Sequence, residues 1–438
     1  MPEWLPEVEQ FRGPTQFVFL RLGIYREANH PHVRFDLTPA RRARHGRNWR
    51  GQGQAVVHGS GIAMPAPFPT AGPLRVACVM GTRPEAIKLA PVIQALRAAP
   101  GVTCDLVSTG QHRELLAQAL ACFGLAADHD LALMRPGQGL TQLTAGVLAG
   151  LEPWLAARRP DWLLVQGDTT TALAAAMAGF YAGIPVAHVE AGLRTHDPHA
   201  PWPEEMNRSL IARLAALHFA PTETARANLL REGVAPGAVR VTGNTGIDAL
   251  LAVAARAPPP PQEELVLVTG HRRESFDGGL ARTAVALAHL ARRPGLRIVV
   301  ALHLNPRAEA PLRAALAAVP QVSLLPPQDY PDFVALMQQA RLIVTDSGGV
   351  QEEAPSLGVP VLVTRDETDR PEAVEAGTVR LVGTDGSRLL AAATELLDDP
   401  AAHARMARAH NPYGDGKAAP RIVEALLAAQ PARRTLSA

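Results

Sequence analysis

The stretch RLIVTDSGGVQEEAPSLGVPVLVT (341–364) contains an apolar run, a Ser-Gly-Gly turn, a helical segment and a second apolar run. The two runs, 341–346 and 360–364, are short and continuously apolar, which is typical of strands buried on both faces of a parallel sheet. The turn leads directly into the helix, so free backbone N–H groups and the positive end of the helix dipole meet there. That arrangement suits a phosphate, although Ser-Gly-Gly is also an ordinary glycine turn.

The same alternation extends in both directions from this stretch. A proline run, 258–261, separates two series of apolar strands and Ala/Leu-rich helical segments. Two series in tandem predict an α/β protein with two Rossmann-like, doubly wound domains facing a central cleft. The expected strands are 74–80, 103–109, 162–167, 185–190, 217–221 and 239–243 in the first series, and 264–270, 297–303, 322–327, 341–346, 360–364 and 379–383 in the second.

The N-terminal stretch differs from the rest of the chain. Residues 1–63 lack helix or strand periodicity, and a Pro/Gly-rich segment follows at 64–73. We expect 1–73 to be an extension that is disordered or is upstream sequence ahead of a start at Met64, with a basic partner-binding arm as the alternative. The first domain is then expected at 74–250 and the second at 251–410.

Composition excludes several classes of protein. The 438 residues are 47% hydrophobic and 19% charged with a net charge of +2, so nothing favours nucleic acid or an anionic membrane. Three cysteines without a C-x-x-C pair argue against a disulfide framework or a structural zinc site, and for the reducing cytoplasm. No apolar signal-peptide core is present near the start. The charge-free run 169–189 contains Gly179, Gly183 and Pro185, and it predicts a buried helix, a turn and a strand rather than a membrane span.

Basic residues follow the first strand of the first series. In GTRPEAIKLAP (81–91), Pro84 suits a helix start, and Arg83 and Lys88 lie about one and a half turns apart. Lys88 is one of only two lysines among 43 basic residues. The two side chains either project into the cleft or are solvated on a surface helix, and these readings weigh equally on this segment alone.

Carboxylates follow two further strands. Asp168 comes after 162–167 and Glu190 ends 185–190, so both are expected at one edge of the sheet. Carboxylates close together hold one pKa up, which suits proton transfer. Asp168 taken alone is better explained as a helix cap. Glu204 stands at a helix start, where an acid also complements the helix dipole.

The second series adds polar residues at strand ends. Glu353 lies about one turn into the helix after Ser347, Gly348 and Gly349, where it can accept bonds from ribose hydroxyls. His271 follows the strand at 264–270 and is either catalytic, a phosphate contact or structural. No G-x-G-x-x-G follows any strand, so a dinucleotide cofactor has no support, and no metal site is expected.

Together these segments resemble the non-hydrolysing UDP-N-acetylglucosamine (UDP-GlcNAc) 2-epimerases. The resemblance runs from about Leu74 to about Ile422 and rests on the motifs GTRPEAIKLAP, STGQHREL, QGDTTTALAAAMAGF, HVEAGLRT, PWPEEMNR, TGHRRE, TDSGGVQEEAPSLGVPVLV and NPYGDG. It implies a glycosyltransferase-B-like fold, a homodimer, and no cofactor. It also implies that 411–438 forms a helix that packs back on the first domain, followed by a tail.

The resemblance also implies roles for particular residues. Those matching substrate binding and acid/base work are Asp168, Glu190, Glu204 and His271. Those matching nucleotide or diphosphate contacts are Arg83, Lys88, Gln328, Phe333, Ser347, Gly348, Gly349, Glu353 and Arg370. A second UDP-GlcNAc, bound as an allosteric activator, is matched in part by Gln111, Gln138, Arg272 and His303. Gly137 stands where some relatives carry a basic residue, which leaves activator dependence open.

The expected reaction inverts C2 of UDP-GlcNAc to give UDP-N-acetylmannosamine (UDP-ManNAc). A base removes the C2 proton as UDP leaves C1, and 2-acetamidoglucal is then reprotonated from the other face as UDP returns. Such chemistry needs carboxylates, cations for the departing UDP and a closed cleft. A hydrolysing epimerase, a glycosyltransferase of similar fold and a catalytically silent nucleotide-sugar sensor are the alternatives.

Overall fold

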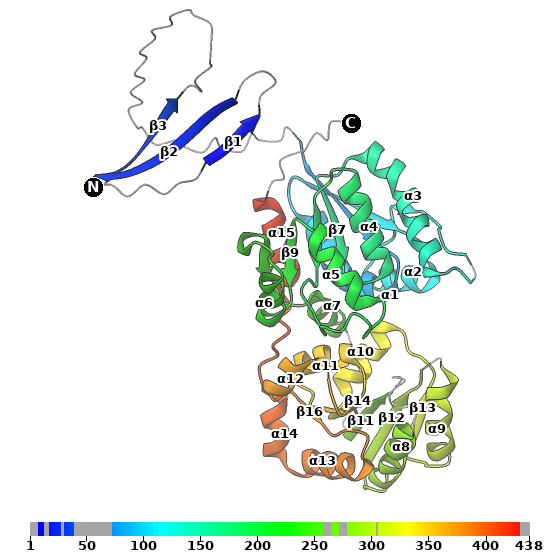
Figure 1. Ribbon diagram of the computed structural model, residues 1–438. Helices are drawn as coiled ribbons and strands as arrows, with labels where there is room; N and C mark the ends of the chain where they lie inside the picture. The colour runs from blue at the N-terminus through cyan, green and yellow to red at the C-terminus, as the bar shows by residue number, and fades with distance from the viewer. Residues whose placement is uncertain are drawn as a thin grey trace, which may run out of the picture. The chain divides into compact units, whose positions relative to one another are not determined.

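The computed structural model describes residues 8–12, 17–27, 30–38, 72–111, 113–135, 137–256, 264–270, 278–303, 305–368 and 370–429. The chain divides into two compact units, Met1–Ala66 and Pro67–Ala438. The second unit contains two parallel sheets with helices, and it carries the candidate site (Figure 1).

The first sheet of this unit has seven parallel strands in the order β10-β9-β8-β7-β4-β5-β6. Its first strand, β4, lies between β5 and β7, so the chain winds outward first in one direction and then in the other, as in doubly wound nucleotide-binding folds. The strands are β4 (Leu74–Met80), β5 (Val102–Ser108), β6 (His129–Asp130), β7 (Trp162–Gln166), β8 (Val186–Val189), β9 (Leu217–Ala220) and β10 (Val239–Val241). The helices are α1 (Arg83–Ala98), α2 (Arg113–Cys122), α3 (Leu140–Arg158), α4 (Thr170–Tyr181), α5 (Glu204–Leu214), α6 (Glu223–Arg231), the short 3₁₀ helix η1 (Pro236–Ala238) and α7 (Thr245–Ala254).

The second sheet repeats this winding with six parallel strands in the order β13-β12-β11-β14-β15-β16. The strands are β11 (Glu264–Thr269), β12 (Leu296–Ala301), β13 (Val322–Leu325), β14 (Leu342–Thr345), β15 (Val361–Val363) and β16 (Val379–Leu381). The helices are α8 (Gly279–Leu290), α9 (Pro306–Leu316), α10 (Tyr330–Gln339), α11 (Gly348–Glu353), η3 (Ala354–Leu357), α12 (Pro371–Glu375), α13 (Gly386–Asp398) and α14 (Pro400–Ala407). The last helix, α15 (Ala418–Ala428), packs against helices of the first sheet.

The predicted α/β class and the strands expected in both series are confirmed. Each expected strand is present, with ends that differ from the prediction by no more than about two residues, the usual disagreement at element ends. All residues of β7 and β8 are buried, which explains their continuous apolar character. The sequence prediction missed β6, because two residues carry no periodicity.

The charge-free run 169–189 folds as predicted. It forms α4, a turn in which Gly183 has a φ of +68°, and β8. In the part of the chain that the structure describes, no helix combines the length and the apolar character needed to cross a bilayer.

One apolar cluster joins the helices of the two sheets. It includes Ile93 of α1, Leu250 of α7, Met337 of α10 and Leu426 of α15. Helix α7 contacts both α10 and α11, while α15 contacts α1 and α7 (Figure 1). The helices around the two sheets therefore pack into one apolar cluster. This cluster supports the loops at the carboxyl ends of the first sheet's strands.

The first unit contains strands that the sequence prediction did not include. An antiparallel sheet in the order β1-β2-β3 is formed by β1 (Val8–Arg12), β2 (Phe17–Glu27) and β3 (His30–Thr38). These strands differ from the expectation that residues 1–63 lack strand periodicity. Apolar residues alternate at Val33, Phe35 and Leu37, a period of two that is typical of a strand.

Candidate active site

Glu190 and Lys88 form the central ion pair of the candidate site. Glu190 directly follows β8, and its backbone adopts a left-handed φ of +63°. Its Oε2 accepts hydrogen bonds from Lys88 Nζ at 2.5 Å and from Gln166 Nε2 at 2.7 Å. Because Gln166 ends the neighbouring strand β7, two adjacent strands and α1 fix this carboxylate.

Lys88 lies within reach of charges from both sheets. Burial would lower the pKa of Lys88, but the Glu190 and Glu352 carboxylates outweigh it, and the pKa is raised above its ordinary value. Lys88 is therefore a cation at neutral pH, partly enclosed where the loops after β4 and β8 meet. A compact ammonium at this point suits an anionic group such as a diphosphate.

Asp168 lies in the loop after β7 and is paired with an arginine. Arg208 of α5 donates from Nη2 to Asp168 Oδ2 at 2.6 Å and also lies 3.4 Å from Glu205 Oε2. Asn207 donates to the Asp168 backbone carbonyl at 2.8 Å. Glu204 begins α5, and its position four residues before Arg208 places it on the helix face that meets the Asp168 loop. The structure thus brings three of the four predicted acid/base candidates to one edge of the first sheet.

Two buried side chains support these loops. Burial lowers the pKa of His188 to about 3, so its ring is neutral, and its Nε2 lies 2.7 Å from the carbonyl oxygen of Gly167, next to Asp168. Glu205 accepts hydrogen bonds from the backbone N–H groups of Thr195 and His196 at 3.1 and 3.0 Å. The loops that carry Asp168 and Glu190 are therefore held by buried polar contacts.

The second sheet contributes acidic and basic groups from α11 and its neighbours. Glu352 is buried, accepts a hydrogen bond from Asn244 Nδ2 at 2.7 Å and is paired with Arg370. Burial, with Glu352 adding to it, raises the pKa of the adjacent Glu353 to about 8. Asn244 belongs to the first sheet's side of the molecule, so Glu352 also links the two sheets.

The predicted phosphate turn has the expected local geometry. Ser347 caps α11, and its backbone N–H donates to Thr345 Oγ1 at 3.0 Å, which holds the turn against the end of β14. A Cβ added to Gly349 would approach no described atom more closely than Ser347 Oγ, at 4.0 Å. Packing among the described residues therefore does not require this glycine, and the space beside it is open to a ligand.

Other predicted nucleotide contacts lie around the same region. Arg83 Nη2 donates to the backbone carbonyl of Gln328 at 3.4 Å, which connects α1 to the loop after β13. Gln328 itself donates to Pro326 O, and Phe333 of α10 packs against the apolar cluster shared by the two sheets. Gly348 is buried at the start of α11.

The described residues matched to a second ligand site each contact a different neighbour. Gln111 Oε1 accepts from Thr171 Oγ1 at 2.8 Å, beside the loops of the candidate site. Gln138 Oε1 accepts from the Arg135 backbone, and His303 Nδ1 accepts from the Asn305 backbone. His271 and Arg272 lie outside the described residues, so their predicted roles stay predictions.

Several residues in this constellation were not predicted from the sequence, namely Gln166, Arg208, Glu205 and Glu352, and Glu85, which accepts a hydrogen bond from Thr169 next to Asp168, is another. Glu85 had a signal, since Thr82 and Glu85 have the spacing of a capping box. Arg208 lies one turn after Glu204, a weaker signal. The sequence carries no sign of the partners that these residues find.

Comparison with known proteins places this chain in a family. The family model for UDP-N-acetylglucosamine 2-epimerase matches residues 94–427. The UDP-N-acetylglucosamine 2-epimerase of Escherichia coli strain K12 is 53% identical over 369 residues, which cover 81% of this chain and 98% of that protein. That of Yersinia pestis is 52% identical with the same coverage. The chain belongs to the UDP-N-acetylglucosamine 2-epimerase family.

Solved structures agree with this assignment. The crystal structure of UDP-GlcNAc 2-epimerase from Neisseria meningitidis bound to UDP-GlcNAc is 44% identical, with a TM-score of 0.76, and the match covers 81% of this chain and all of that one. The Methanocaldococcus jannaschii enzyme in complex with UDP-GlcNAc and UDP is 33% identical, with a TM-score of 0.68 and the same coverage.

Proposed function

We propose that this protein reversibly epimerises C2 of UDP-GlcNAc to give UDP-ManNAc, without hydrolysis, by elimination and re-addition of UDP. The observation that carries the proposal is the Lys88–Glu190 ion pair at 2.5 Å, which lies within the field of Glu352 and at the end of the strand next to the one that Asp168 follows. Cations and carboxylates meet there at the carboxyl ends of parallel strands, where ligands bind in doubly wound folds. The UDP-GlcNAc bound to the Neisseria meningitidis relative supports the choice of substrate.

The residue types fit the chemistry. The hydrogen at C2 is barely acidic, so its removal must accompany departure of UDP from C1. Glu190, Asp168 and Glu204 are the candidates to take the proton from one face and return it to the other. Lys88 and Arg83 would stabilise charge on the departing diphosphate, and the turn at Ser347–Gly349 would hold the nucleotide. UDP must stay bound while 2-acetamidoglucal is reprotonated, which requires a closed site.

The test is a proton NMR time course on UDP-GlcNAc in heavy water, with no NAD or metal added. We expect UDP-ManNAc to appear at constant total sugar nucleotide, with deuterium at C2 of both epimers. Release of UDP and free N-acetylmannosamine would instead identify a hydrolysing epimerase. No turnover without an acceptor would favour a glycosyltransferase or a nucleotide-sugar sensor. Epimerised product that fully retains its C2 hydrogen would exclude the elimination mechanism.

We infer that a second UDP-GlcNAc acts as an allosteric activator through Gln111, Gln138, Arg272 and His303. The position of Gln111 beside the loops of the candidate site supports this inference. The expected result is that pure UDP-ManNAc turns over slowly until a trace of UDP-GlcNAc is added. A hyperbolic rate curve with no such activation would show that this protein works without the second site.

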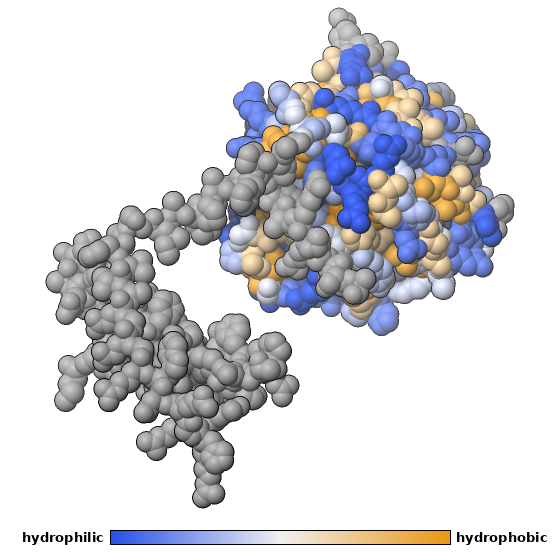
Figure 2. Space-filling model, turned by 90° about the horizontal axis from the view of Figure 1, so that it is seen from above, coloured by the Kyte–Doolittle hydropathy of each residue, from blue (hydrophilic) through white to orange (hydrophobic). Residues whose placement is uncertain are grey.

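We also propose that the protein is a cytoplasmic homodimer. Its three cysteines are free thiols, as in a reducing compartment. In the view of Figure 2, apolar areas of the surface lie between polar ones. The large exposed apolar side chains include Phe180 (56% exposed) and Tyr181 (66%), at the end of α4, and Trp202 (67%), just before α5.

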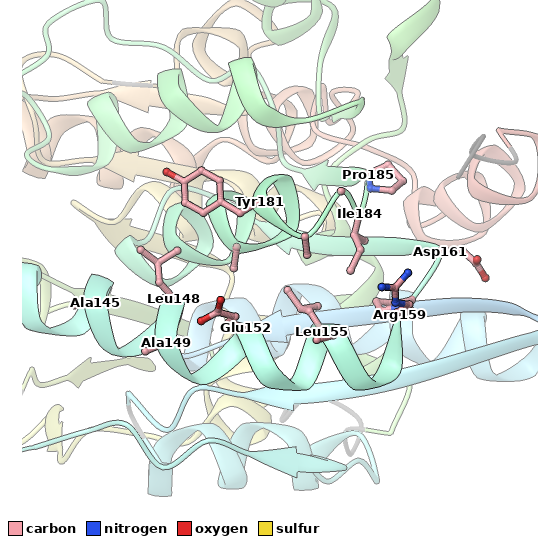
Figure 3. A pocket seen from close by; sticks show the side chains of 15 residues that line it. Ala145, Leu148, Ala149, Glu152, Leu155, Arg159, Asp161, Tyr181, Ile184 and Pro185 are labelled. Atoms are coloured by element: carbon pink, nitrogen blue, oxygen red, sulfur yellow. The ribbon is translucent and has the colours of Figure 1, made fainter. Parts of the chain in front are cut away.

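A cavity lined in part by Tyr181 offers a place for the Phe180 and Tyr181 side chains of a second copy. It has a volume of about 710 Å³ and lies between α3 and the end of α4, where Leu148 and Leu155 face Tyr181 and Ile184 (Figure 3). The exposed pair Phe180 and Tyr181 and the cavity next to it lie on one surface, which suits a twofold interface. In such an interface the aromatic side chains of each copy fill the cavity of the other. Tyr181→Glu is expected to shift the mass measured by light scattering from dimer to monomer. A wild-type protein that is monomeric would overturn the proposal.

A further inference from the structure

Glu85 is a buried carboxylate that the proposed chemistry does not use. It lies in the first turn of α1 and has no exposed surface. Four hydrogen bonds converge on it, from the Gly81 N–H (3.0 Å), the Thr82 N–H (2.7 Å), the Thr82 hydroxyl (2.7 Å) and the Thr169 hydroxyl (2.8 Å). Burial raises the pKa of Glu85, and the hydrogen bonds from these donors oppose that rise by favouring the ionised form.

The two oxygens of Glu85 hold two different loops. Oε2 accepts the three bonds from Gly81 and Thr82, in the loop after β4. Oε1 accepts the bond from Thr169, which caps α4 and directly follows Asp168. Strands β4 and β7 are neighbours at the point where the winding direction reverses, so their loops diverge there. Glu85 joins these loops across that point.

A local cap alone does not explain this arrangement. A capping box requires only that the Glu side chain bind the backbone of the capping residue, here Thr82. The bond to Thr169 joins residues 84 positions apart, on a different strand's loop. Packing is also tight there, because a Cβ on Gly81 would lie 2.5 Å from Thr109 Oγ1 and 2.7 Å from Thr171 Oγ1.

We propose that Glu85 is a positioning residue that fixes Asp168 relative to Arg83 and Lys88. Arg83 and Lys88 lie on the same helix as Glu85, while Asp168 directly precedes Thr169, the residue through which Glu85 holds the loop after β7. In the proposed reaction, Asp168 must meet the sugar while the two cations meet the diphosphate of the same molecule. Glu85 thereby sets the distance between the reacting carbon and the leaving group. The inference rests on the proposed function, and the experiment separates the two.

The test compares catalysis with UDP binding in four variants. Glu85→Gln keeps the length of the side chain but replaces one acceptor oxygen with an NH₂ group, so the side chain can no longer accept hydrogen bonds from both loops. Thr169→Val removes the hydroxyl, and Thr169→Ser keeps it. Asp385→Ala removes an exposed cap of α13, whose carboxylate accepts from the Ser387 N–H, and serves as the control for loss of a helix cap.

We expect Glu85→Gln and Thr169→Val to lower kcat by about 10²-fold at a temperature well below the melting point, because a misplaced group costs about that much. The Kd for UDP, measured by calorimetry, is expected to change by less than about threefold, because the cations stay on α1. Thr169→Ser is expected to keep wild-type kcat. Asp385→Ala is expected to lower the melting temperature with kcat unchanged.

Equal losses in kcat and UDP affinity, in step with the melting temperature, would show a merely structural role and overturn the proposal. A wild-type kcat in Glu85→Gln would overturn it as well. If the wild-type protein itself fails to epimerise UDP-GlcNAc, the proposed function is wrong and this inference falls with it. Normal wild-type turnover with an unaffected Glu85→Gln variant leaves the proposed function intact and removes only the positioning role.

Discussion

Lys88 is one of only two lysines in a chain whose other basic residues are arginines. Its surroundings explain why a lysine is present at this position. Its ammonium lies 2.5 Å from Glu190, and its Cε would lie 3.7 Å from a Cβ on Gly246. A planar guanidinium is larger and would have to displace one of these neighbours. The room available at position 88, as well as the charge, therefore favours a lysine there.

We expect Lys88→Arg to lower kcat/KM by at least about tenfold, roughly 1.4 kcal/mol of transition-state stabilisation, although charge is conserved. Lys417→Arg, at the only other lysine and on the exposed surface, is the matched control. Steady-state kinetics on UDP-GlcNAc would measure both. A Lys88→Arg enzyme equal to wild type would reduce the lysine to an accident of codon use.

The carboxylates at the strand ends give the second prediction. Asp168→Asn, Glu190→Gln and Glu204→Gln keep side-chain shape and remove a base. At least two of the three are expected to lose about 10²–10⁴ in kcat while remaining folded by circular dichroism. Glu223→Gln, at a carboxylate that is 75% exposed, is the control. Near wild-type kcat in all three would mean that the site is misplaced.

Glu353 predicts a pH dependence of stability. Its pKa is raised to about 8 by burial, from an ordinary value of 4.5, so folding favours the protonated form. The contribution of Glu353 to the free energy of unfolding is therefore greatest below about pH 4.5, and this contribution is lost as the pH rises through 8. Glu353→Gln cannot ionise, so its melting temperature should gain on that of the wild type between pH 5 and 9, by several degrees.

Melting curves over that pH range would check the prediction. Glu375→Gln, which removes an exposed carboxylate from α12, is the control for the loss of one charge. Parallel curves for the wild type and Glu353→Gln would contradict the burial of this carboxyl group.

At the scale of elements, α4 shows why an Ala-rich helix lies where it does. The helix packs close to β7 and β8 through small residues that are almost all buried. A Cβ on Gly179 would lie 2.7 Å from Leu163 Cδ2 and 3.0 Å from Val186 Cγ2, both on the sheet. The close approach of this helix brings its capped start, and therefore Asp168, to the edge of the sheet.

Gly179→Ala is therefore expected to destabilise the protein by about 1–3 kcal/mol through overpacking, despite the better helix propensity of alanine. Gly146→Ala in α3 is a matched control, because its Cβ would meet nothing closer than 3.9 Å. That variant should be stabilised by about 0.5–1 kcal/mol. Chemical denaturation of both proteins gives the two differences. The same sign for both would show that α4 can move away from the sheet.

At the scale of the whole molecule, the second unit holds both parallel sheets and every described candidate residue. We expect a protein that begins at Met64 to keep kcat, KM and melting temperature, because the proposed site draws on nothing before that residue. The measurement compares this protein with the full chain, together with mass spectrometry of the native N-terminus. A truncated protein that melts several degrees lower or loses activity would show that residues 1–63 contribute to the fold.

The parallel sheets and the polar residues at their carboxyl ends were predictable because they are properties of short segments. A strand buried on both faces is a continuous apolar run, and the helix after it has a helical period of apolar residues. Each element can therefore be recognised from its own short segment. The placement of Asp168 and Glu190 at one sheet edge follows from that pattern. The strands at 8–38 also have a local signal, since apolar residues alternate at Val33, Phe35 and Leu37.

The pairings within the site depended on the tertiary structure. Lys88 and Glu190 are 102 residues apart, Glu85 and Thr169 are 84 apart, and Asn244 and Glu352 are 108 apart. Each of these residues has an ordinary local role, as a surface cation, a cap or a helix acid, and that role is all its neighbours in sequence can indicate. Which carboxylate meets which donor depends on how neighbouring strands align and how closely the helices pack. That information exists only where distant segments are in contact.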